Sequence, residues 1–124
     1  MTKETCIEKV CNLPLDFKSS DKSTITLLQD SKFADLYKDI SRQDIKEYLL
    51  HHEHLIDEWK IWSEDKRTSG GYYLLLDTDQ HFVGSLEKIG GERFAKSFTT
   101  NEDACAEFIL QEVGTILEIE INKD

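Results

Sequence analysis

The sequence predicts an α+β fold in one domain: N-terminal helices, a three-stranded antiparallel meander and a closing C-terminal helix. Up to residue 62, apolar residues recur at intervals of three and four, the period of a helix with one buried face. Short apolar runs separated by glycines and polar turn residues occupy 72–98, and the helical period returns after Thr99. With 124 residues and no repeat or long linker, the chain 1–124 is expected to form a single globular domain.

The N-terminal part predicts two helical segments. Residues 5–13 carry apolar side chains at helical spacing, and Pro14 then predicts a break that leads into a polar loop. Ser23 is a candidate N-cap for the second segment, which is expected to end around Ile40 with an interruption near residues 30–31.

A longer helix is expected from Ser41 to about Trp62. Ser41 and Asp44 have the spacing of a capping box, in which each side chain bonds the other residue's backbone N–H. The apolar stripe that follows predicts that Trp59 faces the core and that Trp62 faces outward. The stripe consists of Ile45, Tyr48, Leu49, His52, Ile56 and Trp59.

The middle of the chain predicts the three strands. Residues 72–76 form a short apolar run of the kind that is buried on both faces. Polar residues at 77–80 and the two glycines at 90–91 supply the turns on either side of the middle strand. Because successive strand residues face opposite ways, one of Tyr72 and Tyr73 must point outward, and Tyr73 is the candidate.

The closing helix has two candidate starts, because Thr99 with Glu102 and Thr100 with Asp103 both have capping-box spacing. Its apolar stripe consists of Ala104, Cys105, Phe108, Ile109, Val113, Ile116 and Leu117. Residues 115–121 fit either the end of this helix or a terminal strand, since apolar and acidic residues alternate there.

Acidic residues outnumber basic residues by 25 to 15, which gives a formal net charge of −10. The bias is strongest in 101–124, where seven acids accompany Lys123 as the single base. Such a field repels phosphate backbones and anionic lipid, and it raises encounter rates with basic surfaces. We therefore expect no direct nucleic-acid binding and a partner with a basic surface. Solubility alone is the alternative explanation of the charge.

Targeting and membrane signals are absent from the sequence. No apolar run approaches the roughly 20 residues that cross a bilayer. Residues 1–15 lack the basic start and apolar stretch of a secretory signal, so a cytoplasmic protein without membrane attachment is expected. Cys6, Cys11 and Cys105 have neither zinc spacing nor a CxxC pair, and they predict buried free thiols rather than disulfides.

No arrangement of residues predicts catalysis or metal binding. His51 and His54 are the only histidine pair spaced to converge on one helical face, and a second ligand-bearing segment is missing. Cys105 lies on the apolar stripe, which favours an inert core thiol over a nucleophile activated by His81. We expect no metal, no cofactor and no enzymatic activity.

The candidate binding residues fall into two groups. Around the end of the long helix, aromatic residues are bordered by charges, a composition typical of interface hot spots. On the closing helix, acids beyond the apolar stripe predict an electrostatic landing surface, with a simple solvated face as the alternative. The candidates are Asp57, Glu58, Trp62, Glu64, Asp65 and Tyr73 in the first group, and Glu107, Glu112 and Glu118 in the second.

Two stretches of the chain carry a family resemblance. One comprises 57–59 (DEW), 62–67 (WSEDKR) and 71–73 (GYY), and the other runs through 98–105 (FTTNEDAC) to 108–109 (FI). Both resemble segments of small bacterial immunity proteins that neutralise contact-dependent growth-inhibition toxins or other polymorphic toxins. The resemblance implies tight, stoichiometric binding to a cognate toxin domain, often a basic nuclease, by covering its active site or substrate groove.

Two other classes stay open. The protein is alternatively a small enzyme or enzyme subunit whose site is dispersed in sequence, or an acidic adaptor protein. An enzyme should gather polar groups with shifted pKa values in a concave pocket, whereas an inhibitor should present an exposed acidic or aromatic patch.

Overall fold

The computed structural model describes residues 2–64, 72–76, 80–89 and 92–119. It confirms the α+β fold, in which N-terminal helices precede a three-stranded antiparallel sheet and a C-terminal helix. The turns expected at 77–79 and at the two glycines 90–91 lie outside the described residues.

The N-terminal helices are more numerous than predicted, and the first of them matches the helix expected over 5–13 to within two residues. They are α1 (Lys3–Cys11), α2 (Leu13–Ser19), α3 (Thr24–Ser31), α4 (Phe33–Leu36) and the 3-10 helix η1 (Tyr37–Asp39). The expected break is confirmed at Asn12, between α1 and α2, but Pro14 leads into a helix and the loop begins only at Ser20. Pro14 lies in the first turn of α2, where a missing backbone N–H costs no hydrogen bond. The interruption near residues 30–31 is confirmed, since Lys32 adopts a left-handed conformation with φ 64° between α3 and α4.

The predicted long helix is two helices, α5 (Arg42–Leu50) and α6 (His54–Glu64). The capping box at Ser41 and Asp44 is confirmed, with both reciprocal hydrogen bonds present. The chain leaves the helix at His51, whose backbone N–H bonds the carbonyl of Tyr48 at 3.2 Å. The apolar stripe continues across the break, which is why the spacing alone did not predict it.

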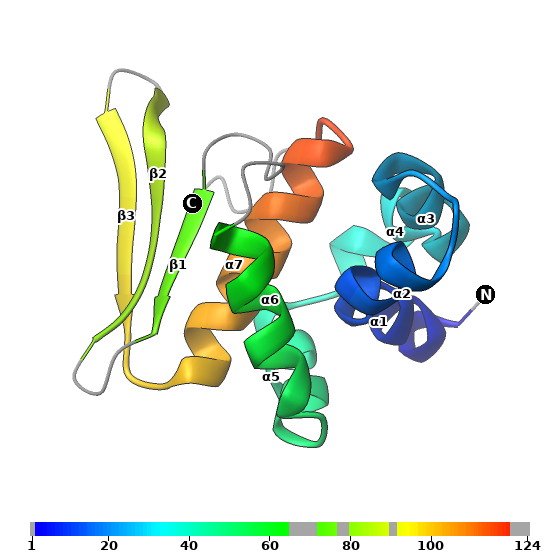
Figure 1. Cartoon of the computed structure of the whole chain (residues 1–124), viewed down its shortest axis with the longest axis horizontal. Coiled ribbons are helices and arrows are strands. Elements are labelled where there is room, and N and C mark those ends of the chain that lie inside the picture. The colour runs from blue at the N-terminus through cyan, green and yellow to red at the C-terminus, as the bar shows by residue number, and fades with distance from the viewer. Residues whose placement is uncertain (1, 65–71, 77–79, 90–91, 120–124) are drawn as a thin grey trace.

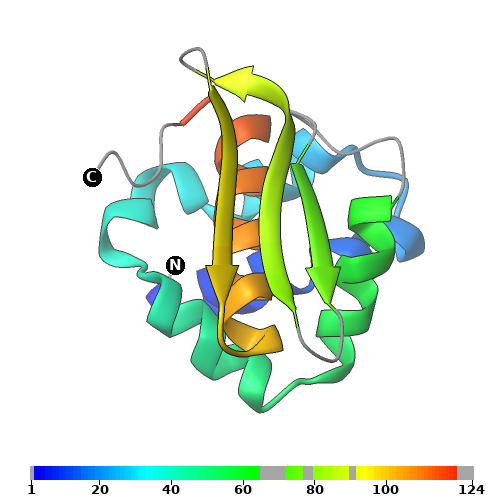
Figure 2. The ribbon, with the colours of Figure 1, turned by 90° about the vertical axis from the view of Figure 1, so that its left-hand side faces the viewer.

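The sheet consists of β1 (Tyr72–Leu76), β2 (His81–Ile89) and β3 (Glu92–Phe98), paired in that order. The meander is therefore confirmed. The expectation that β1 is buried on both faces is wrong, because Leu74 is 5% exposed whereas its neighbour Leu75 is 39% exposed. One face of the sheet is therefore open (Figure 2).

The closing helix is α7 (Asn101–Ile116). Of the two candidate starts, the one at Thr100 is correct, because its hydroxyl oxygen accepts from the backbone N–H of Asp103 at 3.2 Å. The helix ends at Ile116, and Glu118 then adopts a left-handed conformation with φ 57°. A strand over 115–119 is thus excluded, and residues 120–121 lie outside the described part of the chain.

Helix α7 is the centre of the molecule. It lies between the sheet and the N-terminal helices (Figure 1), and it contacts all three strands as well as α1, α3, α5 and α6. In Figure 2, the sheet lies in front of α7, and no described element covers the near face of the sheet. None of the helices in the described ranges has the length and apolar character needed to cross a bilayer.

Candidate functional site

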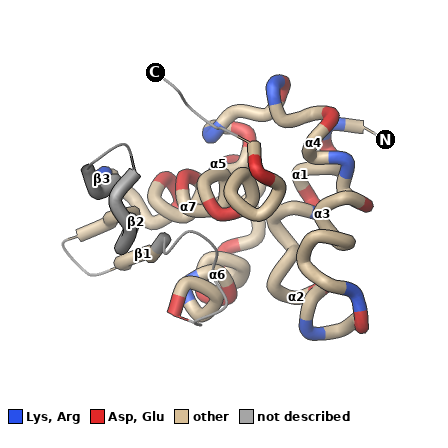
Figure 3. Tube along the Cα trace, turned by 90° about the horizontal axis from the view of Figure 1, so that it is seen from above, with Lys and Arg blue, Asp and Glu red and all other residues tan. Residues whose placement is uncertain are grey.

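Two of the predicted surface acids, Glu107 and Glu112, are buried. Their exposed fractions are 1% and 0%, so the prediction that they form an acidic landing surface is wrong. Figure 3 shows the acidic positions of α7 in the middle of the molecule, between the sheet and the N-terminal helices. The reason is that α7 is covered on several sides, so its polar positions also meet other elements.

Glu107 is held by side chains from three other positions. Its Oε1 lies 3.2 Å from Arg42 Nη1 and 3.7 Å from Lys96 Nζ, and its Oε2 accepts from Gln111 Nε2 at 2.7 Å. Both cations also lie over the Phe98 ring, at 5.0 Å for Arg42 and 5.5 Å for Lys96. A buried carboxylate needs such partners, because an unpaired charge in the interior costs several kcal/mol. Glu107 therefore ties α7 to α5 and β3.

Glu112 and Trp62 form a second internal polar contact. The indole Nε1 of Trp62 donates to Glu112 Oε2 at 2.7 Å, which joins α6 to α7. Trp62 is half-buried and meets the Phe17 ring edge-on at 5.6 Å, so its predicted outward orientation is only partly correct. Trp59 is fully buried as predicted, and its Nε1 donates to the carbonyl oxygen of Cys11 at 2.9 Å.

The remaining acidic candidates lie in separate places. Asp57 and Glu64 are exposed on α6, whereas Glu58 is half-buried and forms an ion pair with Lys18. Glu118 is exposed beyond the end of α7. Asp65 lies outside the described residues. The structure thus divides the predicted site between the core, α6 and the sheet.

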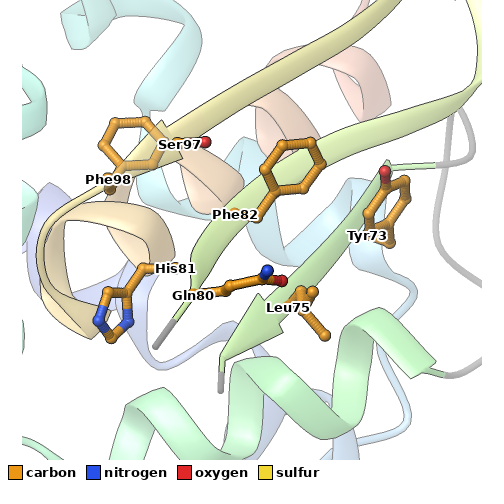
Figure 4. Close-up of a pocket in the computed structure, with 7 residues that line it drawn as sticks. All are labelled: Tyr73, Leu75, Gln80, His81, Phe82, Ser97 and Phe98. Atoms are coloured by element: carbon orange, nitrogen blue, oxygen red, sulfur yellow. The ribbon is translucent and has the colours of Figure 1, made fainter. Parts of the chain in front are cut away.

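Tyr73 belongs to an apolar group on the open face of the sheet, which we call the sheet-face cluster: Tyr73, Leu75 and Phe82. The Tyr73 and Phe82 rings are stacked with centroids 6.0 Å apart and planes at 29°. Figure 4 shows the three side chains lining a hollow of about 370 Å³, with Gln80 at its edge. Tyr73 was predicted from the sequence, whereas Phe82 and Leu75 were not, because only strand register places these two beside each other on adjacent strands.

Gly84 is required for this arrangement. A methyl group at this position would collide with the side-chain ring of Tyr73, because that ring lies directly over the strand. Gly84 faces Tyr73 across the β1–β2 pair and is itself buried. A glycine inside a strand often marks such a close approach. The ring of Tyr73 is therefore held in place by the strand beneath it and by Phe82 beside it.

A second concave feature, missed by the sequence analysis, is a groove on the helical side of the molecule, the α1–α5 groove. It has a volume of about 630 Å³ and is lined by residues of α1 and α5 and by the histidines that follow α5. Four of its lining residues are acidic: Glu4, Glu8, Asp44 and Glu47. Glu4 and Glu8 are four residues apart on α1, and Asp44 and Glu47 are three apart on α5, so each pair shares one face of its helix. This spacing is the sequence pattern that indicates the groove.

The cysteines lie as the sequence predicted, whereas His51, His52 and His54 lie at the break between α5 and α6 and not on one continuous helix. His52 is half-buried, and its ring stacks on Tyr48 at 4.1 Å. Within the described ranges, no group of three or more His, Cys, Asp and Glu residues is placed to hold a metal ion. All three cysteines are buried free thiols. Burial raises the pKa of Cys105 well above its usual value and that of Cys6 to about 11, although a hydrogen bond with Ser31 opposes the latter shift.

The described surface therefore holds two features that are suited to binding a protein: the sheet-face cluster and the α1–α5 groove. The first is apolar and aromatic, and the second is rimmed by acids. Comparison of the chain with protein-family models, with curated protein sequences and with solved structures finds no match in any of the three.

Proposed function

We propose that the protein is an immunity protein that binds a cognate bacterial toxin domain and neutralises it by stoichiometric protein–protein inhibition. The partner is a toxin domain with a basic surface, for example a nuclease. The inhibitor acts without a cofactor. The observation that carries the proposal is the sheet-face cluster, an aromatic pair fixed on a sheet face that no described element covers.

The sheet-face cluster has the properties of an interface anchor. Tyrosine and other aromatic side chains supply large contact areas and are enriched among the residues that dominate binding energy. The position of Tyr73 over Gly84 and against Phe82 fixes its ring before a partner arrives. Binding then costs less side-chain entropy than it would with a freely rotating ring. Exposed Leu75 adds apolar area beside the pair.

The charge of the molecule supports a basic partner. The formal net charge is −10, and the exposed acids Asp57 and Glu64 lie on α6, the helix that packs beside β1. Carboxylates around an apolar anchor raise the association rate with a basic protein more than they raise affinity. Exposed charges act over about 8 Å at physiological ionic strength, so they steer a partner that then contacts the anchor.

The enzyme alternative has less support in the described residues. Shifted pKa values there belong mainly to core thiols and to carboxylates in helix caps or ion pairs, such as Asp44 and Asp103. None of these groups lines the hollow beside the sheet-face cluster. Asp44 lines the α1–α5 groove together with Tyr48, whose pKa is raised, but Asp44 is engaged by the N-cap of α5 and by Lys3. An adaptor that binds a different protein through the same cluster is separated from an inhibitor by the experiment below.

The test is co-expression with a toxin domain encoded by a reading frame that adjoins the gene of this chain. We expect the wild type to restore growth and Tyr73→Ala/Phe82→Ala to protect much less, because the double variant removes the anchor. Ile25→Ala is the control, since Ile25 is an exposed large apolar residue on α3 that lies outside the cluster. Circular dichroism and size-exclusion chromatography establish that each variant is folded.

A second pair of variants separates binding from stability. Gly84→Ala should displace the Tyr73 ring and lower protection with little loss of stability, because its methyl group meets only the far end of that side chain on the open face of the sheet. Adding Tyr73→Ala removes the ring altogether. Protection should stay low in the double variant, because the anchor is gone. Lack of protection by the wild type would reject the immunity function. Full protection by a folded Tyr73→Ala/Phe82→Ala variant would retain that function and reject this surface.

A further inference from the structure

The α1–α5 groove has an apolar floor. Ile7 of α1 and Leu50 of α5 line it, and Leu50 is 44% exposed. The Tyr48 side chain forms part of the wall and is fixed from two sides: its hydroxyl accepts from Asn12 Nδ2 at 3.0 Å, and its ring stacks on His52. His52 is in turn fixed by a 2.9 Å hydrogen bond between its Nδ1 and the carbonyl oxygen of Tyr48. The groove is thus formed before any ligand binds.

Two rows of carboxylates border this floor. Glu4 and Glu8 lie one turn apart on α1, and Asp44 and Glu47 lie one turn apart on α5. Lys3 is the one Lys or Arg among the residues that line the groove, and it is engaged by Asp44 at 3.0 Å. Glu4, Glu8 and Glu47 form no ion pair with any residue in the described ranges.

The negative charge of Glu8 acts on Tyr48 in the wall of the groove. The pKa of the Tyr48 hydroxyl is raised, first by burial and further by the negative charge of Glu8, although the hydrogen bond from Asn12 opposes the shift. The carboxylate of Glu8 is therefore close enough to Tyr48 for its charge to act on a group in the wall. A cation placed between the two rows would be attracted from both sides.

We propose that the α1–α5 groove binds a Lys/Arg-rich amphipathic helical segment of a protein. An apolar stripe on such a segment covers Ile7, Tyr48 and Leu50, while the basic residues on either side of the stripe meet the carboxylates of α1 and α5. This is the helix-in-groove mode of recognition, in which an apolar face gives affinity and flanking charges select the partner. Nucleic acids are disfavoured because their phosphates would meet the same carboxylates.

This inference goes beyond the proposed function. The groove is built from the helical side of the molecule, whereas the sheet-face cluster lies on β1 and β2, so the two surfaces are composed of different elements. A basic segment bound in the groove would belong to a different region of the toxin domain or to another protein. Its binding can be measured without any toxin, so that a negative result here leaves the immunity function untouched.

The probe is a labelled synthetic peptide of about 18 residues, long enough to form a helix, with a leucine stripe flanked by two rows of lysines. Fluorescence anisotropy measures its binding to the full chain at low and at physiological salt. A peptide with glutamates in place of the lysines is the counter-probe. We expect binding of the basic peptide, weakened by salt, and no binding of the acidic one.

Glu8→Lys/Glu47→Lys is the groove variant, and both positions are exposed. Asp21→Lys/Asp39→Lys is the matched control, because it makes the same charge change at exposed positions that do not line the groove. We expect the dissociation constant to rise about tenfold in the groove variant and less than about threefold in the control. Leu50→Ser should weaken binding without changing the net charge.

Three results would overturn the proposal. The first is the absence of binding by the wild type. The second is an equal loss of affinity in the groove variant and its control, which would show that only net charge matters. The third is equally tight binding of the acidic peptide, which would show that the apolar floor binds without charge selection.

Discussion

The acids of α7 and the acids of the α1–α5 groove have opposite roles although both sets lie on amphipathic helices. Glu107 and Glu112 are buried and bind side chains of other elements, whereas Glu8 and Glu47 are exposed and border the α1–α5 groove. The difference follows from how many sides of each helix are covered: α7 contacts strands and helices around it, whereas α1 and α5 each keep a free side. The density of acids along a helix therefore does not locate a binding surface.

Charge reversal of a buried acid should give the largest effect. Glu107→Lys places an ammonium beside Arg42 and Lys96 in the core, and we expect a loss of at least about 4 kcal/mol in the free energy of unfolding. Glu47→Lys, the exposed counterpart, should change this free energy by less than about 0.5 kcal/mol. Urea titrations followed by circular dichroism measure both. Similar losses in the two variants would break the comparison.

The two tryptophans of α6 allow a second comparison between a buried and a half-buried side chain. Trp59→Ala should cost about 3 to 5 kcal/mol, because it empties a fully buried site and removes the hydrogen bond to Cys11. Trp62→Ala should cost less, since Trp62 is only half-buried. Urea unfolding of both variants decides this order. Equal and small losses would mean that α6 is rotated relative to the arrangement described above.

The contact between Glu112 and Trp62 predicts a smaller effect. Glu112→Ala should cost about 2 kcal/mol, because the indole N–H loses a charged acceptor in a buried setting. Glu112→Gln keeps an acceptor oxygen and should cost about half as much. Tryptophan fluorescence reports the change around Trp62, and urea titration gives the energies. A Gln variant that is less stable than the Ala variant would contradict this role of Glu112.

One acid from each region, Asp44 beside the groove and Asp103 on α7, makes the stability of the fold depend on pH. Burial raises the pKa values of Asp44 and Asp103, but hydrogen bonds and nearby cations lower them more, so both lie below their usual value. For Asp103 these groups are Thr100 and Lys46, with Arg42 adding its charge. A lowered pKa in the folded state gives stability that is present above the unfolded value of about 3.9 and is lost as pH falls through the folded value.

Asp103→Asn should therefore be less stable than the wild type at neutral pH and should lose less stability between about pH 4 and pH 2. Asp44→Asn should behave in the same way for the start of α5. Urea titrations at several pH values measure the difference. Parallel curves of stability against pH for the wild type and both variants would show that these carboxylates do not supply the effect.

Local features of the fold could be predicted from the sequence. The capping box at Ser41 and Asp44, the N-cap at Thr100, the meander and the core position of Trp59 follow from spacings of a few residues, and each is confirmed. The break between α5 and α6 was missed because the apolar period continues through His52. Helix α2 was missed because Pro14 was interpreted as a breaker, although proline favours the first turn.

The candidate site was harder to predict because its residues depend on distant partners. The cation nearest Glu107 in the fold, Arg42, is 65 residues away, and Trp62 is 50 residues from Glu112. No helical spacing reports such pairs. Phe82 joins Tyr73 only through strand register, and the groove requires two helices that lie far apart in the sequence. The excess of acidic residues could be counted in the sequence. Which of these residues are buried and which are exposed could not be predicted from it.

The central position of α7 has a consequence for folding during synthesis on the ribosome. Every layer of the fold packs on this helix, yet it is the last described element to be synthesised. Until residues 104–113 emerge, the apolar sides of the earlier helices and the inner face of the sheet have no common core to bury them. Folding is then a late, cooperative event that depends on contacts between distant segments, which favours slow closure. A nascent chain that ends before Asn101 should therefore remain sensitive to proteases even though β1, β2 and β3 have been made.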